Sequence, residues 1–371
     1  MSLQREIETR RRAIKTDSYS MSLGELMNLY QSAELDLHPD FQRFFRWTDA
    51  QKTKLIESIL LGIPLPPVFV SQRYDGVWDV IDGLQRLSAI FQFAGILNGE
   101  DGDQLPDLRL TRAKYLPSLE GKAWEDKGDP NSQDALTAQQ RIDIKRSKID
   151  VNIILRESDV DAKYDMFERL NTGGTQLSEQ EVRNCLLLMS NKGFFSWIEQ
   201  LASHPTFTSS TSLSEKAQEE RYDMELVVRF VTLRTIDPLK LRGLADVGTF
   251  LTDRIIALSE ASLDLSKEGD AFRKTFDLLD AALGDRSFRR YDISKQRFMG
   301  GFLVSVFEVL AMGIGHFADS WTETQSDLDA IEQAAKSIWA NDAFTKWQGS
   351  GVGGTTRIQR TVPLGRELFR R

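Results

Sequence analysis

The chain has 371 residues, 41% hydrophobic and 27% charged, which is typical of a globular protein with one large or two ordinary domains. Its net charge of −8 argues against binding nucleic acid through the overall field, because the phosphate backbone is also negative. No apolar run reaches the roughly 18 residues of a membrane-spanning helix. The charged N-terminal stretch lacks the apolar core of a secretion signal, so we expect a cytoplasmic protein with no membrane partner.

Cysteine and histidine are too sparse for most metal and redox sites. Cys185 is the only cysteine, which excludes an intrachain disulfide and a cysteine-cluster zinc site. The three histidines, His38, His204 and His316, show no spacing such as His-x-x-x-His. We therefore expect no zinc and no haem, and a zinc hydrolase or an HNH-type nuclease is disfavoured.

Basic residues gather in four places along the chain. These clusters lie at 10–12, 145–148, 286–297 and 357–371. Each is expected to be solvated surface, although a local nucleic-acid contact with strong salt dependence stays open.

The N-terminal region begins with a charged arm and two short helices. Residues 1–19 are expected to form the arm, frayed or helical. Capping boxes beginning at Ser22 and Thr48 each predict a helix, because the side chain of the first residue can accept a backbone N–H bond three residues later. The second helix is expected to end at Gly62, where glycine favours helix termination.

A β-hairpin and a third helix follow. Prolines after Gly62 force extended chain, and strands are predicted at 68–70 and 77–81 around a turn at 74–76. The next predicted helix covers 84–97. Residues 98–140 are polar and predict an irregular insertion, and 149–155 is a strand by its β-branched content.

After Arg156 the pattern becomes helical, with few strand signals and few prolines. We therefore predict an α+β chain with three parts: the arm 1–19, a mixed-sheet nucleotide-binding module 20–156, and a mainly helical domain 157–371. The glycine-rich stretch 351–357 lacks the lysine of a P-loop and is interpreted as a flexible tail.

The most informative constellation is the predicted strand–turn–helix at 82–89. Gly83 allows a sharp turn, and the free N–H groups at the start of the helix favour an anion. Arg86 adds a guanidinium suited to phosphate oxygens, and Asp82 could hold Mg²⁺ or orient a water. The alternative is an ordinary turn with a surface arginine.

Two further segments carry candidate pocket residues. In 39–47, aromatic residues alternate with polar ones, which suits base stacking and phosphate contact, or a packed loop. In 166–184, a glycine pair separates two predicted helices and could gather polar side chains into a pocket, or serve only as a connector. The candidates in these segments are Gln42, Arg43, Arg46, Arg169, Asn171, Thr172, Gly173, Gly174 and Arg183.

Four of these stretches, in this order, resemble the N-terminal domain family of GmrSD-type restriction endonucleases. They are Pro-x-Phe-Gln-Arg-x-x-x-Trp at 39–47, the Ile-Leu-Leu-Gly-Ile-Pro-Leu-Pro-Pro run ending at Pro67, Asp-Gly-Leu-Gln-Arg at 82–86, where the family signature is usually written DGQQR, and Phe-Glu-Arg-Leu-Asn-Thr-Gly-Gly at 167–174. The resemblance implies a ParB/sulfiredoxin-like fold in which Gly-x-x-Arg cradles nucleotide phosphates. Gly83 and Arg86 match that pattern, whereas Leu84 replaces the first glutamine of the signature.

The resemblance implies a nucleoside triphosphate and Mg²⁺ as cofactors, and a role in restricting modified or phage DNA. Its expected catalytic residues are Asp82, Gln85 and Arg86, with Asp82 on the metal. The expected nucleotide contacts are Gln42, Arg43, Gly83, Leu84, Arg86 and Ser88, and the second pocket comprises Arg46, Arg169, Asn171, Thr172, Gly173, Gly174 and Arg183.

Two classes of function remain open. One is an NTP-hydrolysing enzyme. The other is a non-hydrolysing sensor or scaffold that recruits a separate nuclease, which the substitution at Leu84 favours. A direct nuclease is disfavoured because no histidine-centred motif is evident, and an oligomer is left open.

Overall fold

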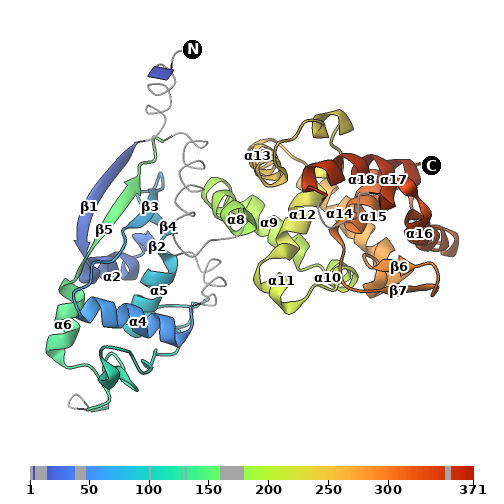
Figure 1. Ribbon diagram of the computed structural model, residues 1–371. Coiled ribbons are helices and arrows are strands. Elements are labelled where there is room, and N and C mark those ends of the chain that lie inside the picture. The colour runs from blue at the N-terminus through green and yellow to red at the C-terminus, as the bar shows by residue number, and fades with distance from the viewer. Residues whose placement is uncertain are drawn as a thin grey trace. The chain divides into compact units, whose positions relative to one another are not determined.

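The computed structural model describes residues 3–4, 15–37, 47–99, 102–126, 128–129, 132–158, 179–346 and 352–371. The chain divides into two compact units, unit 1 (Met1–Gln176) and unit 2 (Leu177–Arg371), coloured blue to green and green to red in Figure 1. The sequence-based boundary after Arg156 remains a prediction, because much of the stretch between it and the division lies outside the described residues.

Unit 1 is built on a mixed five-stranded sheet in the order β1-β5-β3-β4-β2. β3 and β4 form the expected antiparallel hairpin, β5 runs parallel to β3, and β1 runs antiparallel to β5. The strands are β1 (Thr16–Ser22), β2 (Leu35–Asp36), β3 (Val68–Gln72), β4 (Trp78–Asp82) and β5 (Lys148–Ile154). This arrangement, with its helices, confirms the predicted mixed-sheet α+β module.

The helices of unit 1 begin where their capping residues predict. Thr48 closes a complete capping box with Gln51, and the Ser22 hydroxyl accepts the N–H of Glu25 at 3.1 Å. α4 and α5 pack together (Figure 1), and the buried core combines their apolar faces with those of the strands. The helices are α2 (Leu23–Gln31), α4 (Asp49–Leu60), α5 (Leu84–Phe93), η1 (Pro117–Leu119) and α6 (Ala138–Arg146).

The prediction of a charged arm through residue 19 was wrong from Thr16 onward, because Thr16–Ser22 forms β1. This strand lies at the edge of the sheet, and its first five residues are exposed. Its sequence therefore lacks the apolar alternation that marks a half-buried strand, and only its pairing with β5 defines it.

The predicted insertion 98–140 is largely irregular where it is described, but it is tied to α4. Glu57, 4% exposed, accepts the backbone N–H groups of Tyr115 at 2.6 Å and Leu116 at 2.7 Å. Thr53 accepts the N–H of Thr111 at 2.9 Å. These bonds give the irregular segment a fixed course, since buried backbone donors need partners.

Unit 2 is mainly helical, as the sequence predicts, and phenylalanines such as Phe207, Phe230, Phe272 and Phe276 pack ring to ring in its core. Its elements are α8 (Glu179–Ser190), α9 (Lys192–Ala202), α10 (Pro205–Thr211), α11 (Glu215–Glu219), α12 (Tyr222–Leu233), η3 (Pro238–Leu241), α13 (Val247–Glu260), α14 (Leu265–Leu283), η4 (Gly284–Arg286), β6 (Arg290–Asp292), β7 (Arg297–Met299), α15 (Val304–His316), η5 (Ala318–Ser320), α16 (Gln325–Ser337), η6 (Ile338–Ala340), α17 (Asp342–Thr345) and α18 (Gly354–Leu368).

Two elements of unit 2 contradict the sequence analysis or escaped it. The flexible-tail interpretation of 351–357 was wrong from Gly354 onward, where α18 begins and packs along α15. Gly313 on α15 and Gly365 on α18 face each other so closely that a Cβ on either would overlap the other helix's backbone. The hairpin β6–β7 was not predicted, because its strands are only three residues long.

Candidate functional site

The turn between β4 and α5 depends on glycine at position 83. Gly83 has φ +98°, a left-handed conformation that other residues adopt only with strain. A Cβ there would overlap Cγ1 of Val68 and lie 3.0 Å from its Cβ. The turn therefore brings the end of β4 and the start of α5 against β3. The sequence analysis expected the sharp turn at Gly83, but not this contact with Val68.

Arg86 is held by its own chain. Its Nη2 donates to Asp82 Oδ2 at 3.0 Å and to the carbonyl of Pro67 at 3.1 Å, and its Nη1 donates to the carbonyl of Pro66. The side chain is 12% exposed. Burial lowers the pKa of Arg86, and the carboxylate of Asp82 opposes that shift. The sequence analysis predicted that the guanidinium faces a ligand. In the structure it joins α5 to the extended segment before β3 through hydrogen bonds to the carbonyls of Pro66 and Pro67.

Asp82 and the start of α5 remain accessible. The Asp82 side chain is 45% exposed although it pairs with Arg86. The residue at the capping position of α5 is Gly83, which has no side chain to accept the first N–H groups of the helix. The first N–H groups of a helix carry a partial positive charge and need acceptors. A half-exposed carboxylate thus lies beside the start of α5, where Leu84 and Gln85 are partly exposed.

Two of the predicted site residues lie in the interior. Ser88 is 0% exposed on α5, and its hydroxyl has no hydrogen-bond partner within the described residues. Arg183 is 0% exposed on α8, where it bonds Gln180, the Thr252 hydroxyl at 3.1 Å and the carbonyl of Gly248 at 3.3 Å. The predicted ligand contacts of both residues are therefore corrected: Ser88 packs in the core of unit 1, and Arg183 joins α8 to α13.

The remaining candidates lie outside the described residues, so their proximity to the turn stays a prediction. They are Gln42, Arg43 and Arg46 in the first segment, and Arg169, Asn171, Thr172, Gly173 and Gly174 in the second.

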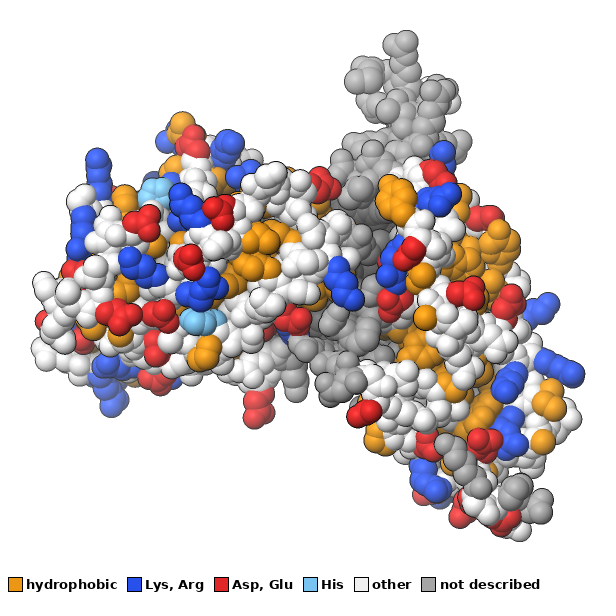
Figure 2. All heavy atoms as spheres, turned by 180° about the vertical axis from the view of Figure 1, so that it is seen from behind, with side chains coloured by type: hydrophobic (Ala, Val, Ile, Leu, Met, Phe, Trp, Pro, Cys, Tyr) orange, Lys and Arg blue, Asp and Glu red, His pale blue; other side chains and the backbone are white. Residues whose placement is uncertain are grey.

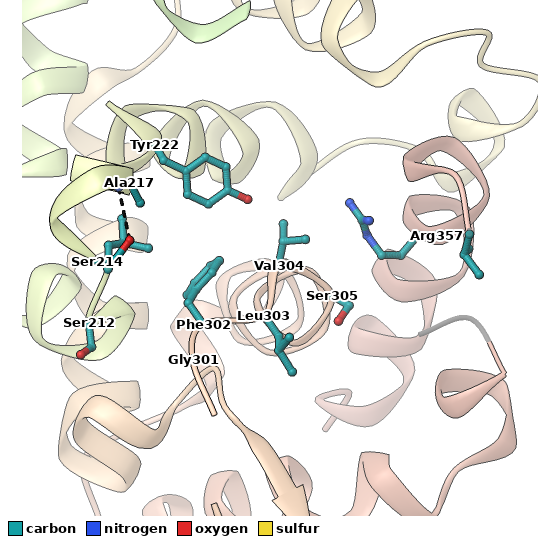
Figure 3. A pocket seen from close by; sticks show the side chains of 12 residues that line it. Ser212, Ser214, Ala217, Tyr222, Gly301, Phe302, Leu303, Val304, Ser305 and Arg357 are labelled. Carbon is teal, nitrogen blue, oxygen red and sulfur yellow. Dashed lines mark hydrogen bonds between the residues drawn. The ribbon is translucent and has the colours of Figure 1, made fainter. Parts of the chain in front are cut away.

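Unit 2 contains a cavity of about 610 Å³ that sequence reasoning missed. In Figure 3, the Tyr222 hydroxyl from α12 and the Arg357 guanidinium from α18 approach it, with Val304 of α15 between them. Burial raises the pKa of Tyr222 to about 12, so its phenol stays protonated at neutral pH. Arg357 donates to the carboxylate of the buried Glu308 at 3.1 and 3.2 Å, so its guanidinium is already part of an ion pair.

Across the described part of the chain, no group of three or more His, Cys, Asp or Glu side chains is arranged to hold a metal ion. Within the same residues, no helix is long and apolar enough to cross a bilayer. Each of the two described histidines contacts another residue of unit 2. His204 lies 3.3 Å from Asp277, and His316 Nδ1 lies 2.8 Å from the carbonyl oxygen of Arg234.

Comparison with known proteins gives one family. Residues 23–188 match the model of the GmrSD restriction endonuclease N-terminal domain, from the first residue of α2 into α8. No curated protein and no solved structure matches the chain. The match includes the β4–α5 turn and the strands β2 to β5 of the sheet, but not β1. Residues 23–188, somewhat less than half of the chain, are therefore identified as a GmrSD restriction endonuclease N-terminal domain.

Proposed function

We propose that unit 1 binds a nucleoside triphosphate with its phosphates at the start of α5. The observation that carries this proposal is the position of the half-exposed Asp82 beside the start of α5, at a turn that depends on Gly83. Backbone N–H groups at a helix start are a general site for phosphate. The family match supports the assignment, since the matched residues 23–188 include the turn at 82–86.

The residues at the turn have different roles in this proposal. The N–H groups of Leu84, Gln85 and Arg86 bind phosphate oxygens. Arg86 is a positioning residue, because it holds Asp82 and the carbonyls of Pro66 and Pro67 in place. Gln42 and Arg43 complete the nucleotide contacts.

Asp82 is the one carboxylate at this turn that could hold Mg²⁺, and it would do so together with the nucleotide. Magnesium in nucleotide sites is held by one or two carboxylates together with substrate phosphates and water. Asp82 supplies one half-exposed carboxylate, and the described residues offer no cluster that would hold the ion without the nucleotide. When bound, the ion would neutralise phosphate charge. Asp82 is the residue that would hold it and orient a water for hydrolysis.

The proposal predicts that Mg²⁺-dependent phosphate release from ATP or GTP falls at least about 100-fold in Asp82→Asn, a loss typical of removing a general acid–base or charged group. The matched control is Asp150→Asn, which removes an exposed carboxylate of β5. Phosphate release is measured on the full chain with and without DNA. Equal turnover by wild type and Asp82→Asn would reject the role of Asp82.

A non-hydrolysing sensor is the second candidate function. It is favoured by the intramolecular partners of Arg86 and by Leu84, which stands where the family signature has glutamine. Under this alternative, the turn binds nucleotide without turnover, and the chain recruits a separate nuclease to modified or phage DNA. Nucleotide binding without phosphate release by the wild type would support the sensor. Measurable phosphate release by Leu84→Gln would then show that Leu84 is the reason why the wild type does not hydrolyse the nucleotide.

A further inference from the structure

The basic cluster 286–297 forms a surface feature of unit 2 that the proposed function does not use. It comprises η4 and the hairpin β6–β7, at the margin of unit 2 in Figure 1. From residue 285 to residue 297 the chain carries five cations and two carboxylates, a net charge of +3 in a chain of −8. Figure 2 shows positive and negative side chains interspersed over the face in view, so a cationic contact has to be local.

Three arginines of the other basic cluster of unit 2 form ion pairs or hydrogen bonds within the fold. In 357–371, Arg357 bonds Glu308, Arg366 donates to the carbonyls of Leu233 and Arg234, and Arg371 pairs with Asp327. Those guanidinium groups fix α18 in place. A run of basic residues in the sequence therefore does not by itself identify a ligand-binding surface. Whether the basic side chains already have partners in the fold determines whether they can bind a ligand.

Three arginines of the hairpin feature keep their charge available. Arg286, Arg290 and Arg297 are exposed, and none forms an ion pair with a carboxylate within the described residues. The two acids of the feature are engaged elsewhere. Asp285 pairs with Arg289 at 2.7 Å, and Asp292 accepts from the Ser294 hydroxyl at 2.6 Å and from a backbone N–H in the hairpin turn at 3.0 Å.

Aromatic rings support two of these arginines. Arg286 lies over the ring of Phe298 at 5.8 Å, and Arg290 lies over the ring of Trp339 at 6.0 Å. A ring contact orients a guanidinium through one face while its edge keeps N–H donors for an anion. The side chains are thus partly ordered before any ligand arrives, which reduces the entropy lost on binding.

The hairpin register sets the spacing of the charges. Arg290 pairs with Met299, and Arg297 pairs with Asp292, so both arginines lie on the same face. They are two residues apart along the hairpin, roughly 7 Å at the usual rise of a strand.

We propose that the β6–β7 hairpin, together with η4, contacts the phosphate backbone of duplex DNA. The observations favour a polyanion with repeated phosphates over a single small anion, because the three exposed cations lie on three different elements, η4, β6 and β7, and do not converge on one point. Duplex DNA is the partner because residues 23–188 belong to a restriction endonuclease domain family. The acidic remainder of the chain is screened at physiological salt, where the Debye length is about 8 Å.

The test measures binding of the full chain to a fluorescent 20-base-pair duplex by anisotropy at several NaCl concentrations. The test variant carries Arg286→Gln, Arg290→Gln and Arg297→Gln. The control variant carries Lys145→Gln, Arg146→Gln and Lys148→Gln, an equal charge loss at the exposed cluster of unit 1. Unchanged melting temperatures establish that both variants fold.

Three phosphate contacts should contribute about −2.7 to the slope of log K against log salt, or on the order of 40-fold between 50 and 200 mM NaCl. We expect the hairpin variant to lose that contribution and the control to keep it. Equal affinity and slope for wild type and the hairpin variant would overturn the proposal, as would tighter binding to single-stranded DNA or RNA of equal length. ATP binding by the hairpin variant should stay unchanged, so failure here is distinguishable from failure of the nucleotide site.

Discussion

Gly83→Ala is expected to destabilise unit 1 by about 2–4 kcal/mol. Part of the loss comes from the left-handed backbone, which costs other residues about 1–2 kcal/mol. The rest comes from the new methyl group, which would overlap Val68 Cγ1 where the turn lies against β3. Urea denaturation followed by circular dichroism measures the loss, and nucleotide binding should fall with it because the start of α5 must shift.

Gly76→Ala is the matched control for this substitution. Gly76 also has a left-handed φ, +91°, but nothing lies within 4 Å of a Cβ built there. Gly76→Ala should therefore lose only the stability that the left-handed backbone costs. The difference in the free energy of unfolding between the two variants then measures the effect of the contact with Val68. Val68→Ala combined with Gly83→Ala should recover part of the loss relative to the sum of the single changes. Equal losses at the two glycines would show that the close approach to Val68 is unimportant.

Glu308→Ala is expected to cost unit 2 about 3–5 kcal/mol, because it removes a buried carboxylate that Arg229, Arg357 and Thr361 share, and Arg229 then keeps only Glu225 among the described carboxylates. Glu308 is 0% exposed on α15 and receives Arg229 from α12 at 3.2 Å. From α18 it receives Arg357 and the Thr361 hydroxyl, the latter at 2.9 Å. One carboxylate thus joins three helices. Thermal or urea unfolding of the variant measures the loss, and α18 should become more susceptible to proteolysis.

The control for Glu308 is an ion pair of similar length at the surface. Asp270 pairs with Arg273 at 2.6 Å, but its side chain is 69% exposed, so water screens the interaction. Asp270→Ala should change stability by less than about 1 kcal/mol. A loss at Glu308 no larger than that at Asp270 would contradict the assignment of the buried network as the link between these helices.

The sequence predicted the features of unit 1 that follow from local rules. Thr48 and Ser22 start helices because their side chains bond nearby N–H groups, and Gly83 turns the chain because it has no Cβ. The predicted helix 84–97 was too long, since α5 ends at Phe93 and Gly95 has φ +69°. Glycine in a left-handed conformation ends a helix even where apolar residues continue the pattern.

The sequence could not predict what depends on distant partners. β1 is polar and exists through its pairing with β5, whose residues lie 126 to 138 positions further along the chain. The partners of Arg86 are backbone carbonyls about 20 residues earlier, and no spacing rule announces them. Likewise, the glycine-rich start of α18 becomes helical because Ile358 and Val362 are buried in the packed unit. Tertiary packing overrides local propensity at these positions.

The most direct measurement follows the backbone amides of residues 83–87 while ATP and Mg²⁺ are added to the ¹⁵N-labelled chain. If the phosphates bind at the start of α5, the largest saturating chemical-shift changes will fall on Leu84, Gln85 and Arg86, and Asp82→Asn will weaken them. If these amides stay unmoved while nucleotide binds, the site lies elsewhere and the β4–α5 turn is only a structural joint.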